Sequence, residues 1–168
     1  MHPSITLKPY STETPDALRL IRYFWKVHND YDQTDTEALR DLDAWTAEGH
    51  RFYFICLDDT PVGFVHLGNR GGKPDWIEDL FVEPSHQNQG IGTAAIQEIA
   101  EEVRTYSDSL YIEAAARNQG AIRLYRKLGF NCLNTVTLRH DFDESAFDVT
   151  RKEQRYDLEF EIRKIKST

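Results

Sequence analysis

The middle of the chain holds two adjacent carboxylates, followed closely by a loop that contains two glycines. Glu78 and Asp79 lie inside the apolar segment 76–82, and the polar loop 87–93 comes a few residues later. A loop of this kind, placed ahead of a helix, can bind an anion through its backbone N–H groups. A carboxylate on a central strand is costly unless it is paired or hydrated, so each acid needs a reason to be there. This stretch is therefore the candidate site of chemistry.

A strand and a helix are expected to hold the loop. Residues 76–82 are rich in β-branched and aromatic side chains, which predicts a strand, and Pro84 ends it because proline cannot donate to a ladder. From Thr93 onward, apolar side chains recur at helical spacing. The start of that helix leaves several backbone N–H groups unpaired at the positive end of the helix dipole. The loop therefore suits a phosphate or pyrophosphate group.

Two common phosphate-binding motifs do not explain the loop. Residues 90–95 formally fit the dinucleotide pattern G-x-G-x-x-A, with Glu113 near the position of a ribose-binding acid. However, a polar segment separates the strand from the first glycine, the unit lies in mid-chain, and too little chain follows Glu113 to complete a doubly wound sheet. The G-x-x-x-x-G-K-[ST] pattern of a P-loop is missing.

Two motifs resemble those of a known enzyme family. Gln87-x-x-Gly90-x-Gly92 is similar to the Q/R-x-x-G-x-G/A acyl-CoA signature of the GNAT N-acetyltransferase superfamily. The segment 118–130 matches, position for position, the N-x-x-A-x-x-L-Y-x-x-x-G-F helix of that family. The resemblance spans roughly residues 5–138. Asn88 stands where many members have glycine, but asparagine tolerates left-handed backbone better than most residues.

The resemblance implies acetyl-CoA as the cofactor. Its pyrophosphate would lie on the N–H groups of residues 87–93, and its pantetheine arm would hydrogen-bond to the strand end like an added strand. A loop that only makes a tight turn is the alternative. The cofactor-binding residues expected on this basis are Leu80, Phe81, Val82, Gln87, Asn88, Gln89, Gly90, Ile91, Gly92, Thr93, Asn118, Ala121 and Tyr125.

Acetyl transfer to an amine needs two proton movements. The alkylammonium must lose a proton, and the departing thiolate leaves more easily if it is protonated. Tyr125 occupies the position of the family's tyrosine and is the expected acid, unless it is only a packed aromatic. Glu78 is the expected base, directly or through water, because the Glu-Asp pair looks like that of polyamine acetyltransferases. Asp79 is the alternative, since strand alternation puts the two acids on opposite faces, and both could be structural.

The acceptor site carries no motif. In the resembling family it is walled by the connection between the first two helices and by that between the last two strands, here residues 28–32 and 139–155. Both are acidic or aromatic, which favours a small cationic amine such as a polyamine or an aminoglycoside-like sugar. A solvated acidic surface is equally compatible. The expected acceptor-binding residues are His28, Asp30, Tyr31 and Glu78.

The sequence thus predicts an N-acetyltransferase that passes the acetyl group of acetyl-CoA directly to a primary amine, since neither motif contains a cysteine nucleophile. Two alternatives remain open: a peptide or protein N-acetyltransferase, and a non-catalytic acyl-CoA sensor. A homodimer through the terminal strand is permitted but not required.

The whole chain, residues 1–168, is expected to form one layered α+β domain. Helices are predicted from residues 15, 35, 93 and 118, with Asp35 or Thr36 capping the second. The resemblance implies a mixed, mostly antiparallel sheet of about seven strands, splayed at the centre and flanked by about four helices. The predicted strands are 5–8, 51–57, 61–68, 76–82, 109–115, 130–138 and 156–162.

Composition excludes several functions. The net charge of −8 argues against nucleic acid as a direct partner, and the chain holds no apolar run long enough to span a bilayer. Six scattered histidines form no ligand cluster, so no metal site is expected. Cys56 and Cys132 fall in predicted strands without C-x-x-C spacing, which predicts two buried free thiols in the reducing cytoplasm.

Overall fold

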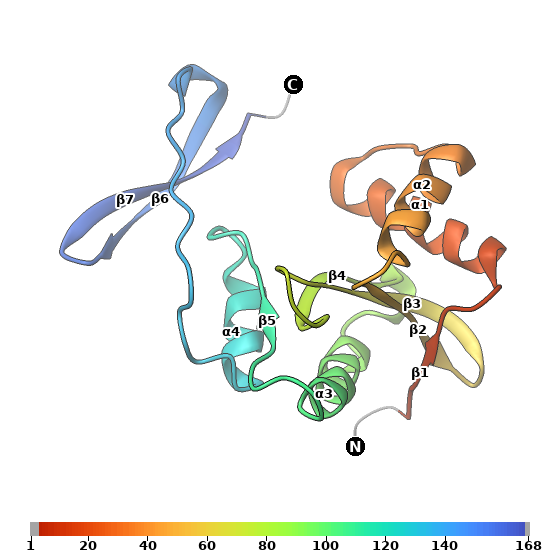
Figure 1. Ribbon diagram of the computed structural model, residues 1–168. Helices are drawn as coiled ribbons and strands as arrows, with labels where there is room; N and C mark the ends of the chain where they lie inside the picture. Colours follow the sequence, from red (N-terminus) through yellow and green to blue (C-terminus); the bar gives the residue numbers. More distant parts are fainter. Residues whose placement is uncertain (1–3, 167–168) are drawn as a thin grey trace. The chain divides into compact units, whose positions relative to one another are not determined.

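The computed structural model describes residues 4–166, so the single domain expected for residues 1–168 extends beyond the described part at both ends. The chain divides into two compact units, one up to Glu113 and one from Ala114 onward. The two units are described separately below, and Figure 1 labels their elements.

The first unit is built on a five-stranded sheet with the order β1-β2-β3-β4-β5. The pairs β1–β2, β2–β3 and β3–β4 are antiparallel, whereas β5 runs parallel to β4. This confirms the mixed, mostly antiparallel sheet that the sequence predicts. The strands are β1 (Thr6–Pro9), β2 (Arg51–Leu57), β3 (Thr60–Gly68), β4 (Trp76–Val82) and β5 (Tyr111–Ile112).

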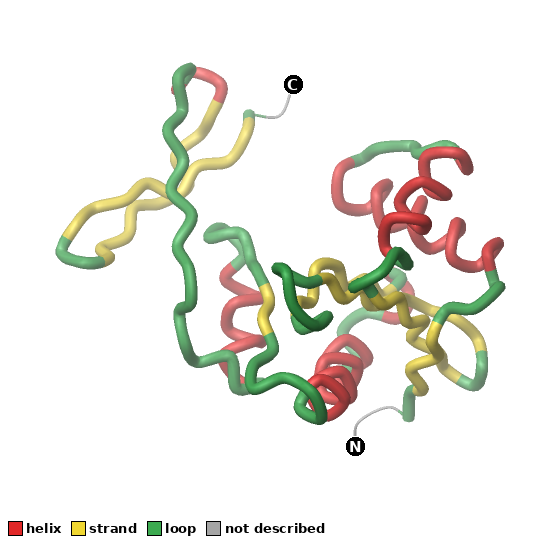
Figure 2. The backbone as a smooth tube through the Cα atoms, in the orientation of Figure 1, coloured by secondary structure: helices red, strands yellow, loops and turns green. Residues whose placement is uncertain are grey.

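Helices cover both faces of this sheet. The helices α1 (Thr14–Asn29) and α2 (Asp35–Trp45) pack on one face, and α3 (Ile91–Val103) lies on the other (Figures 1 and 2). The core under α1 and α2 is aromatic, with Phe64 5.6 Å from Phe24 and 5.0 Å from Phe52 between ring centroids. Offset and edge-to-face aromatic pairs of this kind hold the strands at a defined spacing from the helices.

Helix α2 begins at Asp35, but the residue that caps it precedes Asp35 and Thr36, the two caps expected from the sequence. Its N-cap is Thr34, whose side chain accepts a hydrogen bond from the backbone of Glu37, while the Glu37 carboxylate accepts one from the backbone of Thr34. This capping box satisfies two orphan N–H groups reciprocally, which a cap at Asp35 or Thr36 could not do with Glu37.

The second unit contains α4 (Gln119–Lys127) and a separate hairpin of β6 (Phe147–Arg155) and β7 (Leu158–Ile165). Short 3₁₀ turns lie at Pro84–His86 in the first unit and Glu144–Ala146 in the second. The expected strand 109–115 is reduced to Tyr111–Ile112. The hairpin turns at Tyr156 and Asp157, both left-handed, so the last strand begins after them.

The predicted strand 130–138 is wrong, because that segment pairs with no strand in the described part of the chain. The predicted loop 139–155 instead supplies β6. Strand propensity alone does not make a strand, since the backbone also needs a hydrogen-bonding neighbour. The main sheet therefore has five strands rather than about seven, and β6 and β7 form a separate hairpin.

The two cysteines differ in their surroundings. Cys56 is buried in β2, as expected, whereas Cys132 is exposed because the strand predicted to bury it is a loop. Among residues 4–166, no group of three or more potential metal ligands is found. None of the helices described is long and apolar enough to cross a membrane.

Candidate functional site

The loop between β4 and α3 presents a row of backbone N–H groups. Asn88 (φ 59°) and Gly90 (φ 82°) adopt the left-handed conformation, and Gly90 caps α3 without a side-chain hydrogen bond. Within residues 4–166, the N–H groups of residues 88–93 have no hydrogen-bond acceptor, and Ala94 is the first to bond, to Gly90. The expected left-handed Asn88 is confirmed. Such unpaired amides at the positive end of a helix dipole form an anion site.

Side chains anchor the loop to the strand before it. The Gln87 amide donates to the carbonyl of Val82 at 2.8 Å, and the Gln89 amide donates to the carbonyl of Ser85 at 3.2 Å. A Cβ added at Gly92 would lie 3.9 Å from Leu80 and from Val82, which is ordinary contact distance. The Gln87 bond thus fixes the loop to the end of β4, while the backbone N–H groups of residues 88–93 stay unpaired within the described part of the chain.

The edge of β4 beside the loop is open. Pairing between β4 and β5 covers only Trp76 with Tyr111 and Ile77 with Ile112, with the two aromatic rings stacked 4.7 Å apart. Strand β5 ends at Ile112, so from Glu78 onward this edge of β4 has no pairing strand within residues 4–166. An unpaired strand edge can accept an extended ligand as if it were an added strand. Leu80, Phe81 and Val82 lie along this stretch, where the sequence analysis expects them.

A β-bulge places both acids of β4 on one face of the sheet. Asp79 lies opposite His66 and Ile77 opposite Leu67, which leaves Glu78 as the extra residue. The Glu78 carboxylate would be 2.6 Å from a Cβ at Gly68, and Gly68 shares a face with His66 because the two are two residues apart in β3. The expectation that strict alternation separates the two acids is therefore wrong. The bulge interrupts the alternation at Glu78.

Each acid has its own partner. Arg70 donates to both Glu78 oxygens, one of them at 3.1 Å, and its guanidinium lies 4.3 Å from the centroid of the Trp76 ring. The Glu78 side chain is one-quarter exposed (25%). Asp79 pairs with His66 at 2.8 Å, and the second nitrogen of His66 lies 2.9 Å from His50. Neither carboxylate is an isolated charge.

The sequence analysis missed Arg70, His50 and His66. One signal was available, because His66 follows Phe64 by two residues and so occupies a core-facing position of a strand. A buried imidazole there requires a partner. The identity of that partner depends on strand register, which the sequence alone does not provide.

Asn118, Ala121 and Tyr125 belong to α4 of the second unit. The Asn118 side chain caps the helix by accepting from the backbone of Ala121 at 3.1 Å, as expected. The Tyr125 ring lies 6.0 Å from that of Phe130. Burial raises the pKa of Tyr125 above its ordinary value of 10.0, so the phenol is protonated at neutral pH.

The expected acceptor-binding residues lie at the end of α1. The His28 ring is 6.1 Å from Phe81 of β4, which brings this end of α1 beside the site strand. Asp30 pairs with Lys26 at 2.8 Å, and the Tyr31 hydroxyl donates to Glu37. Asp30 and Tyr31 are therefore engaged locally. Glu78, the fourth expected residue, lies in the bulge described above.

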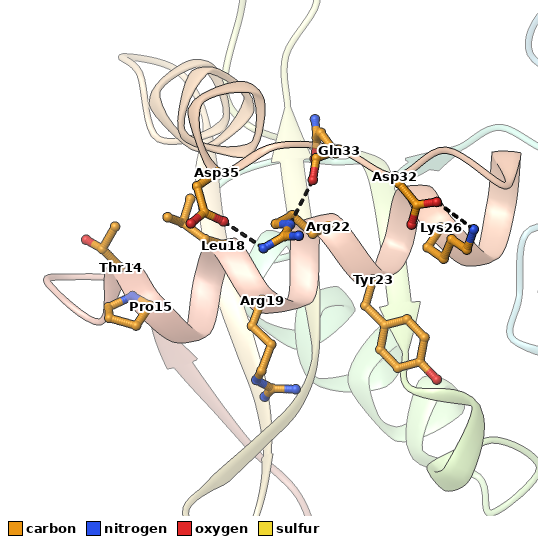
Figure 3. Close-up of a pocket in the computed structure, with 10 residues that line it drawn as sticks. All are labelled: Thr14, Pro15, Leu18, Arg19, Arg22, Tyr23, Lys26, Asp32, Gln33 and Asp35. Atoms are coloured by element: carbon orange, nitrogen blue, oxygen red, sulfur yellow. Dashed lines mark hydrogen bonds and ion pairs between the residues drawn. The ribbon is translucent and has the colours of Figure 1, made fainter.

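A recess of about 590 Å³ lies along α1 (Figure 3). Arg22 donates to the carbonyl of Gln33 and to Asp35, and Lys26 pairs with Asp32. Its lining is not predominantly acidic, so this recess gives no electrostatic support for a polycation. The lining residues are Thr14, Pro15, Leu18, Arg19, Arg22, Tyr23, Lys26, Asp32, Gln33 and Asp35.

Known proteins resemble this chain in part of its sequence and in its fold. The sequence model of the acetyltransferase (GNAT) family matches residues 17–130. The [ribosomal protein bS18]-alanine N-acetyltransferase of Escherichia coli K12 is 34% identical over 65 residues, which are 38% of this chain and 42% of that protein. The N-alpha-acetyltransferase RimI of Mycobacterium tuberculosis is 30% identical over 74 residues, 42% of this chain and 46% of that protein.

The match spans less than half the length of these two curated relatives. Among solved structures, an aminoglycoside acetyltransferase from an uncultured soil metagenomic sample aligns with a TM-score of 0.63, covering 83% of this chain and 97% of that one. Its identity of 19% shows likeness of fold alone. The α+β architecture is thus the GNAT fold, as predicted. Because the family model covers more than half of its residues, the chain belongs to the acetyltransferase (GNAT) family.

Proposed function

We propose that this protein is an acetyl-CoA-dependent N-acetyltransferase that transfers the acetyl group directly to a primary amine. The observation that carries the proposal is the row of unpartnered amides at residues 88–93, next to the open edge of β4. Both features fit coenzyme A, since the amides suit its pyrophosphate and the strand edge suits its amide-containing pantetheine arm. When bound, acetyl-CoA supplies an activated acyl group as a thioester.

The cofactor-binding residues proposed are those of β4 and its loop. Leu80, Phe81 and Val82 provide backbone groups along the open edge, and residues 87–93 provide the anion loop. Gln87 contributes indirectly, because its side chain holds the carbonyl of Val82 and so fixes the loop to the strand. Asn118 and Ala121 form the start of α4, where the family motif places a cofactor contact.

Two groups are proposed to move protons. Tyr125 is the acid that protonates the departing thiolate, a role that its raised pKa permits at neutral pH. The base is proposed to lie in the polar cluster of Glu78, Asp79, His66 and His50, in which the sequence predicts Glu78, or alternatively Asp79, for this role. The absence of a cysteine from the two motifs favours direct attack over an acyl-enzyme.

The acceptor is proposed to be a small cationic amine, such as a polyamine or an aminoglycoside-like sugar. The net charge of −8 supports a cationic partner through long-range attraction. A second candidate is the α-amine of a peptide or protein. This second candidate is favoured by the curated relatives, because their names describe the acetylation of a ribosomal-protein alanine and of an α-amine.

A thiol-release assay with acetyl-CoA tests the activity across spermidine, kanamycin, free amino acids and a peptide that begins with alanine. Turnover with spermidine or kanamycin supports the first candidate, and turnover with the peptide alone supports the second. Binding of acetyl-CoA without turnover of any amine supports the non-catalytic sensor and contradicts the proposal.

The anion loop is tested by Gly90→Ala, with Gly71→Ala as the matched control. Both glycines are left-handed, with φ of 82° and 88°, and a Cβ at Gly71 would contact nothing within 4 Å. Both variants therefore carry a similar backbone strain, but only Gly90 belongs to the loop. We expect Gly90→Ala to weaken acetyl-CoA binding by about tenfold or more in calorimetry, which is ~1.4 kcal/mol. Equal affinities for the two variants would contradict the role of the loop.

A further inference from the structure

Three side chains behind the bulge of β4 form a continuous chain of hydrogen bonds. Asp79 Oδ2 lies 2.8 Å from His66 Nδ1, and His66 Nε2 lies 2.9 Å from His50 Nδ1. The three residues come from different places in the sequence: β4, β3 and the turn between α2 and β2. His66 is only 3% exposed, and its ring lies nearly parallel to those of Trp45 and His50, with centroid distances of 5.0 Å and 5.2 Å.

The chemistry of these groups determines which atom donates and which accepts in each of the two hydrogen bonds. An ionised carboxylate only accepts hydrogen bonds, so His66 donates from Nδ1 to Asp79. With a neutral ring, His66 Nε2 is then an acceptor, and His50 must donate to it from Nδ1. The proton of a neutral His50 is thereby placed on Nδ1, which leaves a lone pair on Nε2. Within residues 4–166, His50 Nε2 has no hydrogen-bond partner.

The surroundings of His50, burial above all, favour the neutral ring. Burial lowers the pKa of His50 below its ordinary value of 6.5, and His66 acts in the same direction. Glu78 of the bulge raises this pKa, and Arg70, from the β3–β4 connection, lowers it. These are the charged and titratable groups that act on the ring, and burial dominates. His50 is thus a free base at neutral pH, and it lies among the side chains of the candidate site.

The obvious alternative base is already engaged. Both oxygens of Glu78 are held by one guanidinium, that of Arg70. A bidentate pair of this kind engages both carboxylate oxygens in charge-assisted hydrogen bonds. Asp79 is in turn bonded to His66. Among the four imidazole nitrogens of His50 and His66, His50 Nε2 is the one that takes part in no hydrogen bond within residues 4–166.

We propose that His50 is the catalytic base of the acetyl transfer, and that His66 and Asp79 are positioning residues that set its tautomer. This inference rests on the proposed function. One proton of the alkylammonium passes to His50 Nε2, and the freed amine lone pair forms the new C–N bond as the C–S bond breaks. Tyr125 is the candidate donor of the proton that ends on the thiol sulfur; the second amine proton then restores the Tyr125 phenol by way of water, and His50 later returns its own proton to water. Asp79, acting through His66, stabilises the protonated ring.

The hydrogen-bonded relay of Asp79, His66 and His50 is tested by the variants His50→Gln and Asp79→Asn, with His140→Gln as the control. His140 is exposed, lies in the second unit and takes no part in the proposed chemistry. The readout is the pH profile of kcat/KM for whichever acceptor of the panel is turned over fastest, together with the affinity for acetyl-CoA. We expect His50→Gln to lower kcat/KM by about a hundredfold at pH 7 and to remove the limb that falls below the pKa of His50.

Asp79→Asn has a distinct expected signature. Without the Asp79 anion, the protonated form of His50 is less stable. The acidic limb of the kcat/KM pH profile should therefore shift to lower pH, while the affinity for acetyl-CoA is retained. A merely structural role would lower the melting temperature without moving the limb. Wild-type kcat/KM and an unchanged pH profile in His50→Gln, as in His140→Gln, would overturn the proposal while leaving the acetyltransferase function intact.

A second measurement needs no acceptor. Long-range ¹H–¹⁵N NMR of the ligand-free protein should show His50 with its proton on Nδ1, and the Asp79→Asn variant should lose this single tautomer. A proton on Nε2 of His50 in the wild type would overturn the relay even if the enzyme is active. A protein that neither binds acetyl-CoA nor acetylates any amine would instead overturn the function itself, and with it the catalytic role of His50.

Discussion

Glu78 and Asp79 are neighbours in the sequence, but their surroundings assign them different roles. Glu78 is paired with the guanidinium of Arg70, whereas Asp79 is hydrogen-bonded to the imidazole of His66. Because the bulge brings both to one face, the two acids and two histidines form a single cluster. The chemistry of each residue at this site is therefore set by its partner more than by its own type.

Replacing Tyr125 with Phe separates an enzyme from a sensor. The phenol keeps its proton at neutral pH, and its loss removes the proposed donor to the thiolate without removing the ring. We expect kcat to fall by about a hundredfold or more, with the affinity for acetyl-CoA unchanged. Tyr156→Phe, at an exposed hairpin turn, is the control in steady-state kinetics. An unchanged kcat in Tyr125→Phe would remove this tyrosine from the mechanism.

Glu37 should give the protein a defined acid sensitivity. Its hydrogen bond from Tyr31, followed by those from Thr34, lowers the pKa of Glu37 to about 2 from 4.5. A carboxyl with a depressed pKa in the folded state stabilises it above the unfolded value and loses this effect as the pH falls. The difference in melting temperature between wild type and Glu37→Gln should be present at pH 7, shrink below about pH 4.5 and vanish near pH 2. A difference independent of pH would contradict this.

At the scale of elements, the start of α2 is held by its capping box. Thr34→Ala removes the side chain that accepts from the Glu37 backbone, and we expect a loss of about 1 kcal/mol in the free energy of unfolding. Thr36→Ala is the matched control, since Thr36 is exposed inside the helix and its hydroxyl has no partner in residues 4–166. It should be neutral or slightly stabilising. Urea unfolding measures both, and a reversed order would place the cap elsewhere.

The close approach of β3 to β4 depends on a glycine. A Cβ at Gly63 would lie 2.2 Å from the carbonyl oxygen of Phe81, a backbone atom that can move only if the strands separate. Gly63→Ala should therefore cost more than about 2 kcal/mol in the free energy of unfolding. In Gly72→Ala the added methyl would meet nothing within 4 Å, and stability should hardly change. Equal midpoints in chemical denaturation would contradict the register of β4.

At the scale of the whole molecule, the buried core belongs to the first unit, and the hairpin of the second unit has only its two strands. A lone two-stranded hairpin is marginally stable in water. We expect the amide hydrogens of β2 and β3 to exchange on the order of a hundredfold or more slowly than those of β6 and β7. Hydrogen exchange read by mass spectrometry checks this, and equal protection would show that the hairpin is as stable as the main sheet.

Local patterns were sufficient to predict the site's scaffold. The strand at 76–82, the loop after it and the helix that follows are each encoded in a short run of residues, because β-propensity, proline and glycine positions and helical periodicity act over a few positions. The strands β2 and β3 and the cap at Asn118 follow the same logic and are confirmed. The family motifs are likewise contiguous, which is why the fold class could be predicted from the sequence.

The sequence by itself thus determined most elements of the first unit and the glycine-containing loop after β4, whereas only the tertiary structure decided the last strands and how the polar side chains combine. Residues 130–138 alternate like a strand but pair with no strand within residues 4–166, and β6 forms instead where a left-handed turn at Tyr156 pairs two later segments. His50, His66 and Asp79 meet through strand register and a one-residue bulge. Such pairings are long-range, since a shift of one residue reverses the face of every side chain in a strand.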